Sequence, residues 1–181
     1  MKKILITDGV HPLMIEEFTI AGYECDYQPA ISLERVHEIV GDYVGLIINS
    51  KIKVDKRMLD NAHQLTFVGR LGSGMEIIDL EYAAQKNVAI YGAPEGNRNA
   101  VGEHSLGMLL ALANNLNRAD REVRKKVWKR EANRGFELMG KTVGIVGFGH
   151  TGVSFTKKLA GMDVNVLAYD KYKKHLSLIH I

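Results

Sequence analysis

The chain has 181 residues, of which 46% are hydrophobic and 25% are charged, and its net charge is +3. This composition is typical of a globular protein of one or two domains, and the charge is too small to indicate nucleic-acid binding without a supporting motif. The single cysteine, Cys25, excludes an internal disulfide, and neither a signal peptide nor an apolar run of the roughly 18 residues that span a bilayer is evident, so we expect a cytoplasmic protein.

Short runs rich in β-branched residues alternate with helical patterns along the chain. We predict strands at 3–7, 43–48, 65–68, 88–91, 142–146 and 164–169, and helices at 12–21, 32–41, 55–62 and 79–86. Most of these strands are almost continuously apolar, as parallel strands buried on both faces are. Asp79 lies at a helix N-cap position, and Gly22 and Gly41 lie at C-cap positions. The alternation predicts an α/β fold with right-handed crossovers.

The pattern changes near residue 92. Residues 92–97 form a turn cluster, and Asn99 can cap the helix that follows. That helix carries one apolar face and is long enough to connect two domains, the face comprising Leu106, Leu109, Leu110, Ala113 and Leu116. Residues 120–131 are strongly charged and predict a solvated helix, although Trp128 within them indicates a partner surface.

A glycine-rich motif follows the strand predicted at 142–146. It reads Gly147-Phe148-Gly149-His150-Thr151-Gly152 and leads into a helix that we expect to end near Gly161. In a dinucleotide-binding turn, the first glycine permits the tight turn, the second lets the pyrophosphate approach the backbone, and the third lets helix and strand pack closely. The free N–H groups and the dipole at the helix N-terminus favour the pyrophosphate. A purely structural glycine turn is the alternative, but the flanking strands favour a cofactor site.

Asp170 ends the second strand of this unit, where a carboxylate accepts hydrogen bonds from the adenosine ribose hydroxyls. A carboxylate there repels a 2′-phosphate, so NAD is favoured over NADP. Lys171, Lys173 and Lys174 leave that choice open, because basic neighbours can accommodate the phosphate.

Several motifs together resemble those of the D-isomer-specific 2-hydroxyacid dehydrogenases, and most closely the D-3-phosphoglycerate dehydrogenase branch. Residues 68–79 resemble the glycine-bearing substrate loop, residues 97–104 the start of the interdomain helix, and residues 140–152 with Asp170 the cofactor site. The resemblance implies a flavodoxin-like substrate domain with a parallel sheet at 1–97, followed at 98–174 by the interdomain helix and the first βαβ of a Rossmann NAD-binding domain. It also implies NAD as cofactor, and a homodimer in the full-length protein with Trp128 at the interface.

The resemblance assigns roles to individual residues. For the cofactor, His150 and Thr151 would line the pyrophosphate. They lie within the fingerprint that also comprises Gly147, Phe148, Gly149 and Gly152. Asp170 would bind the ribose, and Val101 would lie near the nicotinamide. For the substrate, the backbone amides of Gly72, Ser73 and Gly74 would hold the carboxylate, and Asn49, Ser50 and Lys51 would contact the far end. The phosphoglycerate branch typically has arginine where this chain has Asn49; Lys51, Arg130 or Arg134 would then supply the positive charge.

The family's catalytic arginine, glutamate and histidine have no counterpart in this sequence, and we expect them beyond the C-terminus. A full doubly wound cofactor domain has two βαβαβ halves, of which this chain holds at most the first βαβ. Residues 176–181 form a short apolar tail that looks foreign, and we exclude 175–181 from the fold as non-native. We therefore expect a truncated product that does not turn over by itself.

The sequence thus predicts an NAD-dependent oxidoreductase of D-2-hydroxyacids or 2-oxoacids, with 3-phosphoglycerate, and hence serine biosynthesis, as the leading assignment. The alternative is a non-catalytic NAD-sensing or partner-binding protein on the same scaffold. We interpret His104 as a packing or supporting residue, because its neighbour Glu103 does not share its helix face. His11 reads as a loop or helix-start contact, and Arg70 either shapes the substrate loop or pairs with a local carboxylate. No metal-ligand spacing is present, and we expect neither a membrane nor a nucleic-acid partner.

Overall fold

The computed structural model describes residues 1–173 and contains two compact units, Met1–Pro94 and the chain from Glu95 onwards. The boundary lies within 92–97, where the residues from Pro94 onwards are helical and not part of the turn cluster that the sequence predicts. The foreign-looking tail at 176–181 lies outside the described residues. Within residues 1–173, no helix has the length and apolarity needed to cross a membrane.

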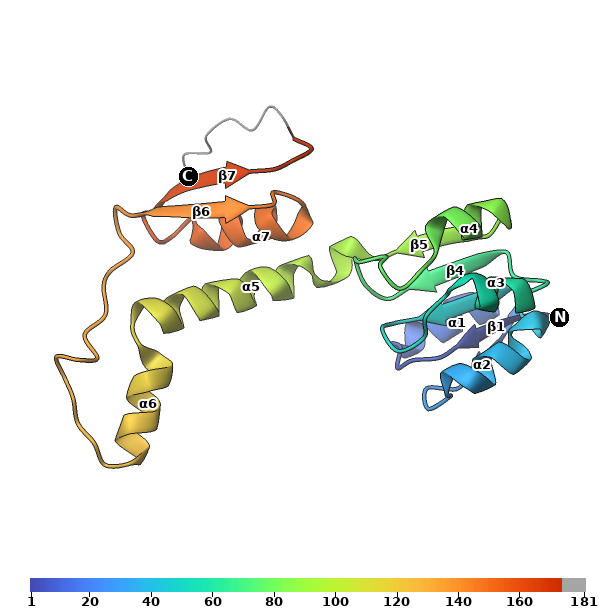
Figure 1. Cartoon of the computed structure of the whole chain (residues 1–181), viewed down its shortest axis with the longest axis horizontal. Helices are drawn as coiled ribbons and strands as arrows, with labels where there is room; N and C mark the ends of the chain where they lie inside the picture. Colours follow the sequence, from blue (N-terminus) through green and yellow to red (C-terminus); the bar gives the residue numbers. More distant parts are fainter. Residues whose placement is uncertain (174–181) are drawn as a thin grey trace. The chain divides into compact units, whose positions relative to one another are not determined.

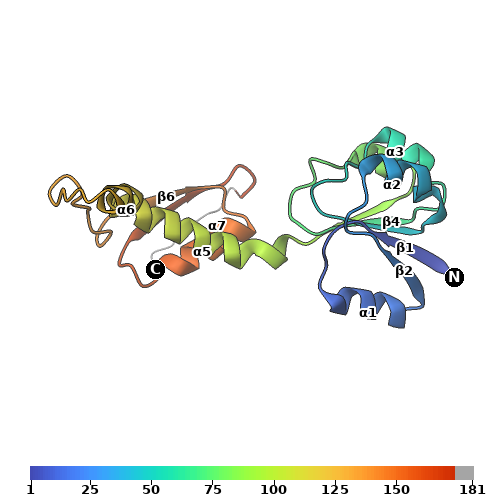
Figure 2. The ribbon, with the colours of Figure 1, turned by 90° about the horizontal axis from the view of Figure 1, so that it is seen from below.

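The first unit is a five-stranded parallel sheet with the strand order β2-β1-β3-β4-β5. Its strands are β1 (Lys2–Ile6), β2 (Tyr23–Tyr27), β3 (Gly45–Ile48), β4 (Phe67–Arg70) and β5 (Ala89–Gly92). Its helices are α1 (Pro12–Ile20), α2 (Leu33–Ile39), the short 3-10 helix η1 (Val40–Asp42), α3 (Lys56–Asn61) and α4 (Leu80–Gln85). Figures 1 and 2 show α1 on one face of this sheet and α2 and α3 on the other. The predicted α/β fold is confirmed.

Both faces of the central strands are buried, as their continuous apolar sequences predict. Leu5 and Leu46 pack with α2, α3 and α4, whereas Ile4, Ile6 and Ile47 pack with the apolar side chains of α1. All five have exposed fractions of 3% or less. Burying an aliphatic side chain of this size contributes about 1.5–3 kcal/mol, so these strands anchor the unit.

Asp79, His11 and Gly22 mark helix ends as their places in the sequence predict, whereas Gly41 does not. Asp79 accepts a hydrogen bond from the Tyr82 backbone N–H and caps α4. Gly22 follows α1 with a φ of +87°, and the His11 imidazole accepts from the Leu13 N–H at the start of that helix. The prediction for Gly41 is wrong: it lies inside η1, where a Cβ would come within 2.9 Å of the Asn61 carbonyl oxygen. Glycine is needed there for close packing, because the φ of Gly41 does not lie in the left-handed region of a glycine helix end.

The second unit begins with two helices, α5 (Pro94–Ala113) and α6 (Leu116–Arg124), and ends with β6 (Thr142–Val146), α7 (His150–Leu159) and β7 (Asn165–Tyr169). β6 and β7 are parallel neighbours. The predicted apolar face of α5 packs on their core, except that Leu116 belongs to α6 and is half exposed. Asn99 does not cap α5, which begins at Pro94, and the charged segment is helical only as far as Arg124.

Candidate cofactor and substrate sites

The turn between β6 and α7 has the geometry that its glycines predict. Gly147 has a φ of +93°, in the left-handed region that favours glycine. A Cβ on Gly152 would collide with the Gly147 carbonyl oxygen, so only glycine lets α7 start this close to β6. Gly149 is the N-cap of α7, and a Cβ there would meet no atom within 4 Å. The backbone at the start of the helix therefore faces open space.

Asp170 is bound to this turn through its carboxylate. One oxygen accepts the Phe148 N–H at 2.8 Å, and the other accepts the N–H groups of Tyr172 at 2.9 Å and Lys173 at 3.1 Å. The hydrogen bonds from Tyr172 and Phe148, with a smaller contribution from Lys173, hold the pKa of Asp170 below its ordinary value. A negative charge is therefore fixed at the mouth of the turn.

A hollow of about 540 Å³ opens beside the turn, between α7 and the first turns of α5. Its lining includes Gly149 and His150 together with three cationic side chains, those of Arg98, Lys157 and Lys173. The Lys173 ammonium donates to the Phe148 carbonyl oxygen at 2.6 Å. The hollow thus combines free backbone at a helix N-terminus with excess positive charge, which suits a phosphorylated ligand.

Of the predicted cofactor residues, only Gly149 and His150 are in this lining. Thr151 is exposed in the first turn of α7, and Val101, which is 37% exposed, lies on α5. Gly102, next to Val101, packs against α7, where a Cβ would come within 2.8 Å of the Ser154 hydroxyl. That close approach fixes α5 against the helix of the glycine turn.

The candidate substrate residues of the first unit follow the carboxyl ends of neighbouring strands. The order β2-β1-β3-β4-β5 reverses between β1 and β3, and ligands of such sheets bind beyond the carboxyl ends at this switch point. Asp8, after β1, accepts from the backbone N–H of Asn49, after β3, at 2.9 Å. Lys51 lies 4.0 Å from the Asp8 carboxylate. The exposed Asn49, Ser50 and Lys51 are therefore tied to the end of β1.

Arg70, the last residue of β4, connects this segment to the loop at 72–74. Its Nε donates to the Asn49 carbonyl oxygen at 3.3 Å, and its two terminal nitrogens bind the two Glu76 carboxylate oxygens at 3.3 and 3.2 Å. A Cβ on Gly74 would collide with Glu76, so the loop lies directly across the ion pair. Arg70 thus fills both roles left open by its sequence: it pairs with a carboxylate and shapes the loop. Glu76 was missed by the sequence analysis.

Known proteins match this chain over almost its whole length. A family model described as D-isomer specific 2-hydroxyacid dehydrogenase, catalytic domain, matches residues 4–175. The chain belongs to this family. The D-3-phosphoglycerate dehydrogenases of Archaeoglobus fulgidus and Methanocaldococcus jannaschii are each 32% identical to it, over 94% and 95% of this chain but only 32% and 33% of their own lengths. The chain therefore spans about a third of the curated relatives that it matches.

Solved structures of the 2-hydroxyacid dehydrogenase type share the fold. The NAD+-bound 3-phosphoglycerate dehydrogenase of Entamoeba histolytica is 25% identical, with a TM-score of 0.75 over 94% of this chain and 54% of that one. A glyoxylate reductase from Paecilomyes thermophila, at 18% identity, has a TM-score of 0.83 over 95% of this chain and 56% of that one. The flavodoxin-like first unit and the Rossmann-type second unit are thus those of the 2-hydroxyacid dehydrogenases.

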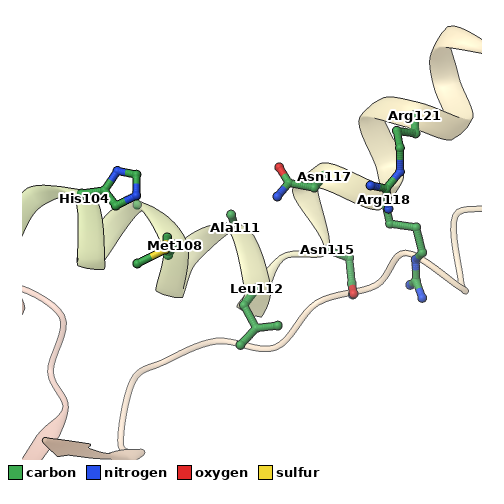
Figure 3. Close-up of a pocket in the computed structure, with 9 residues that line it drawn as sticks. His104, Met108, Ala111, Leu112, Asn115, Asn117, Arg118 and Arg121 are labelled. Atoms are coloured by element: carbon green, nitrogen blue, oxygen red, sulfur yellow. The ribbon is translucent and has the colours of Figure 1, made fainter. Parts of the chain in front are cut away.

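A second hollow, of about 500 Å³, lies along α5 and α6 (Figure 3). Met108 and Leu112 of α5 line it with exposed fractions of 56% and 73%, and Arg118 and Arg121 of α6 line its other end. His104 also lines this hollow and is exposed, so it does not pack within the described residues, and the supporting role stays a prediction. Within residues 1–173, no three metal-ligating side chains gather into a site.

Proposed function

We propose that this chain belongs to an NAD-dependent oxidoreductase of D-2-hydroxyacids, with 3-phospho-D-glycerate as the leading substrate and serine biosynthesis as its context. The observation that carries the proposal is the connection of the Gly147–Gly152 turn to Asp170 through the Phe148 N–H, in a member of the 2-hydroxyacid dehydrogenase family. The identity to D-3-phosphoglycerate dehydrogenases supports the substrate. We place the protein in the cytoplasm.

Each segment has a distinct task in this proposal. The α7 N-terminus, with His150 and Thr151, binds the pyrophosphate; Asp170 accepts from the ribose; and Val101 lies towards the nicotinamide. The amides of the loop at 72–74 hold the substrate carboxylate, and residues 49–51 contact its far end. NAD, when bound, supplies the hydride acceptor for the substrate C2.

We place proton transfer outside these residues, on an arginine, a glutamate and a histidine encoded beyond the present C-terminus. The 181-residue chain is then expected to bind nucleotide without turnover. Expression with the coding sequence that follows residue 174 in the source DNA tests this, and we expect NAD-dependent oxidation of 3-phosphoglycerate. A genuine stop codon near residue 181, or nucleotide binding without turnover in the extended protein, would instead support the non-catalytic NAD-binding alternative.

We also propose that the full-length protein is a homodimer in which a second copy covers the α5–α6 hollow. Its exposed apolar side chains support this, as does Trp128, which is 80% exposed just beyond α6. Aromatic side chains at such positions often anchor protein interfaces. Neither nucleic acid nor a membrane has a place in the proposal.

The nucleotide site is tested with Gly149→Ala. Gly149 has a φ of −82° and open space around its Cβ position, so alanine fits the free protein but projects a methyl group to where the pyrophosphate must approach. We expect 5′-ADP affinity, measured by NMR titration, to fall by at least about tenfold. Gly144→Ala in β6, which likewise meets no atom within 4 Å, is the matched control. Equal affinities of the two variants would contradict the site.

A further inference from the structure

Asp170, the residue expected to exclude a 2′-phosphate, is heavily engaged within the protein. Three backbone N–H groups occupy its two oxygens, from Phe148, Tyr172 and Lys173. A carboxylate has about four acceptor positions, so about one remains for a ribose hydroxyl. Its ability to discriminate between cofactors then depends mainly on its charge.

A lysine lies beside that charge. The Lys173 backbone binds the Asp170 carboxylate, and its ammonium lies 2.6 Å from the carbonyl oxygen of Phe148, whose N–H binds the same carboxylate. The ammonium is thus held at the mouth of the glycine turn by a neutral acceptor. The ammonium has three N–H donors, of which one makes this bond and two remain for a ligand.

The surrounding charge is positive. Arg98 and Lys157 line the hollow together with Lys173, and among residues 1–173 none of the three forms an ion pair with a carboxylate. Two acids of α5 contact the lining: Glu95 lies 3.7 Å from His150, and Glu103 accepts from the Asn99 side-chain amide at 3.0 Å and pairs with Lys158. A phosphate that enters the hollow meets three cationic side chains in its lining, and the Asp170 carboxylate beside the turn is offset by the Lys173 ammonium.

We propose that Lys173 offsets Asp170 and makes this site accept a ribose 2′-phosphate, so that the protein binds NADP-type as well as NAD-type nucleotides. The inference rests on the proposed nucleotide site and concerns its specificity. With a 2′-phosphate, the Lys173 ammonium turns from the Phe148 carbonyl to the phosphate, while the Asp170 carboxylate keeps its backbone bonds. With a free ribose, Asp170 uses its remaining acceptor position for a hydroxyl.

The test compares two half-cofactors, 5′-ADP and adenosine 2′,5′-bisphosphate, by NMR titration of the 181-residue chain and of Lys173→Met. Methionine keeps an unbranched side chain and removes the charge. We expect the unmodified chain to bind both nucleotides within about tenfold of each other, and Lys173→Met to weaken the bisphosphate by at least about tenfold with little change for 5′-ADP. Lys158→Met is the matched control, because Lys158 on α7 pairs with Glu103 at 3.2 Å and does not line the hollow.

The outcomes separate the two proposals. If neither nucleotide binds at millimolar concentration, the nucleotide site itself is wrong and the specificity proposal falls with it. If 5′-ADP binds but the bisphosphate binds about a hundredfold more weakly, Asp170 excludes the 2′-phosphate and only the role of Lys173 is overturned. Equal losses in Lys173→Met and Lys158→Met would show a general charge effect, which also overturns it.

Discussion

The Arg70–Glu76 ion pair joins two side chains of very different exposure. The Arg70 side chain is 10% exposed and is held by the Asn49 carbonyl as well, whereas the Glu76 side chain is 70% exposed. Because the loop at 72–74 lies across the pair, we expect the exposed Glu76 side chain to keep this loop ordered. This gives the proposed carboxylate-binding amides a fixed position before substrate arrives.

Glu76→Gln is expected to loosen that loop. The Glu76 backbone N–H and the Arg70 guanidinium hold the pKa of this carboxyl below its ordinary value. When folding lowers the pKa of a carboxyl, the ionised carboxylate stabilises the fold at pH values above its unfolded-state pKa. That stabilisation is lost as the pH falls through the folded-state pKa. The protection factors of the amides at 71–76, which compare each exchange rate with the intrinsic rate at the same pH, should therefore fall a few-fold in the unmodified chain on acidification, and in Glu76→Gln already at neutral pH. Glu81→Gln serves as control, and loop exchange unchanged by Glu76→Gln would contradict the role.

The residues of the glycine turn were predictable and Glu76 was not, for a physical reason. Gly147, Gly149 and Gly152 are close in sequence, and backbone sterics alone demand glycine at the first and third. The Arg70–Glu76 pair instead forms across an irregular loop, where no helical or strand periodicity brings residues together, so the spacing of the two residues does not predict that they meet. His104 was interpreted as a packing or supporting residue because the adjacent Glu103 does not share its helix face, but that geometry does not show whether the face of His104 is covered, and here it is exposed.

At the scale of elements, the central strands and the edge strand β5 were predictable, and the edge strand β2 was not. β2 pairs only with β1, and its Glu24 and Asp26 break the continuous apolar pattern on which prediction of the other strands relied. The start of α5 was misplaced because Asn99 is a strong capping residue, whereas Pro94, favoured in the first turn of a helix, was assigned to the turn cluster. Pro94 and Asn99 are both typical of helix starts, and the sequence alone does not show which of them begins the helix.

Two glycines of α5 should respond to alanine with opposite signs. Gly102 packs against α7, and a Cβ there would lie 3.1 Å from the Phe155 backbone nitrogen, so Gly102→Ala forces the helices apart at a cost of about 1–3 kcal/mol. A Cβ on Gly107 meets nothing within 4 Å, so Gly107→Ala should stabilise the unit by up to about 1 kcal/mol through helix propensity. Chemical denaturation of dilute protein, followed by far-UV circular dichroism, measures both. A shift of the same sign in both variants would contradict the close α5–α7 packing.

At the scale of the molecule, the two units differ in how well their apolar side chains are covered. The sheet of the first unit has helices on both faces, whereas Val146 and Tyr169 in the two-stranded sheet of the second are 88% and 65% exposed. A two-stranded sheet has little stability of its own. The second unit therefore depends on the packing of α5 and α7, and α5 also carries the hollow proposed to bind a second copy.

That dependence makes the surface of α5 the place to test assembly. Leu112 is 73% exposed at the hollow, so Leu112→Asp costs the isolated chain little, but it would bury an unpaired charge in the proposed dimer. We expect the mass measured by light scattering at micromolar concentrations to change from dimer to monomer, while far-UV circular dichroism stays the same. Leu13→Asp, at a leucine of α1 that is 54% exposed, is the control. An unmodified chain that is monomeric throughout this range would show that the hollow alone does not sustain a dimer, and a dimer that survives Leu112→Asp would place the interface elsewhere.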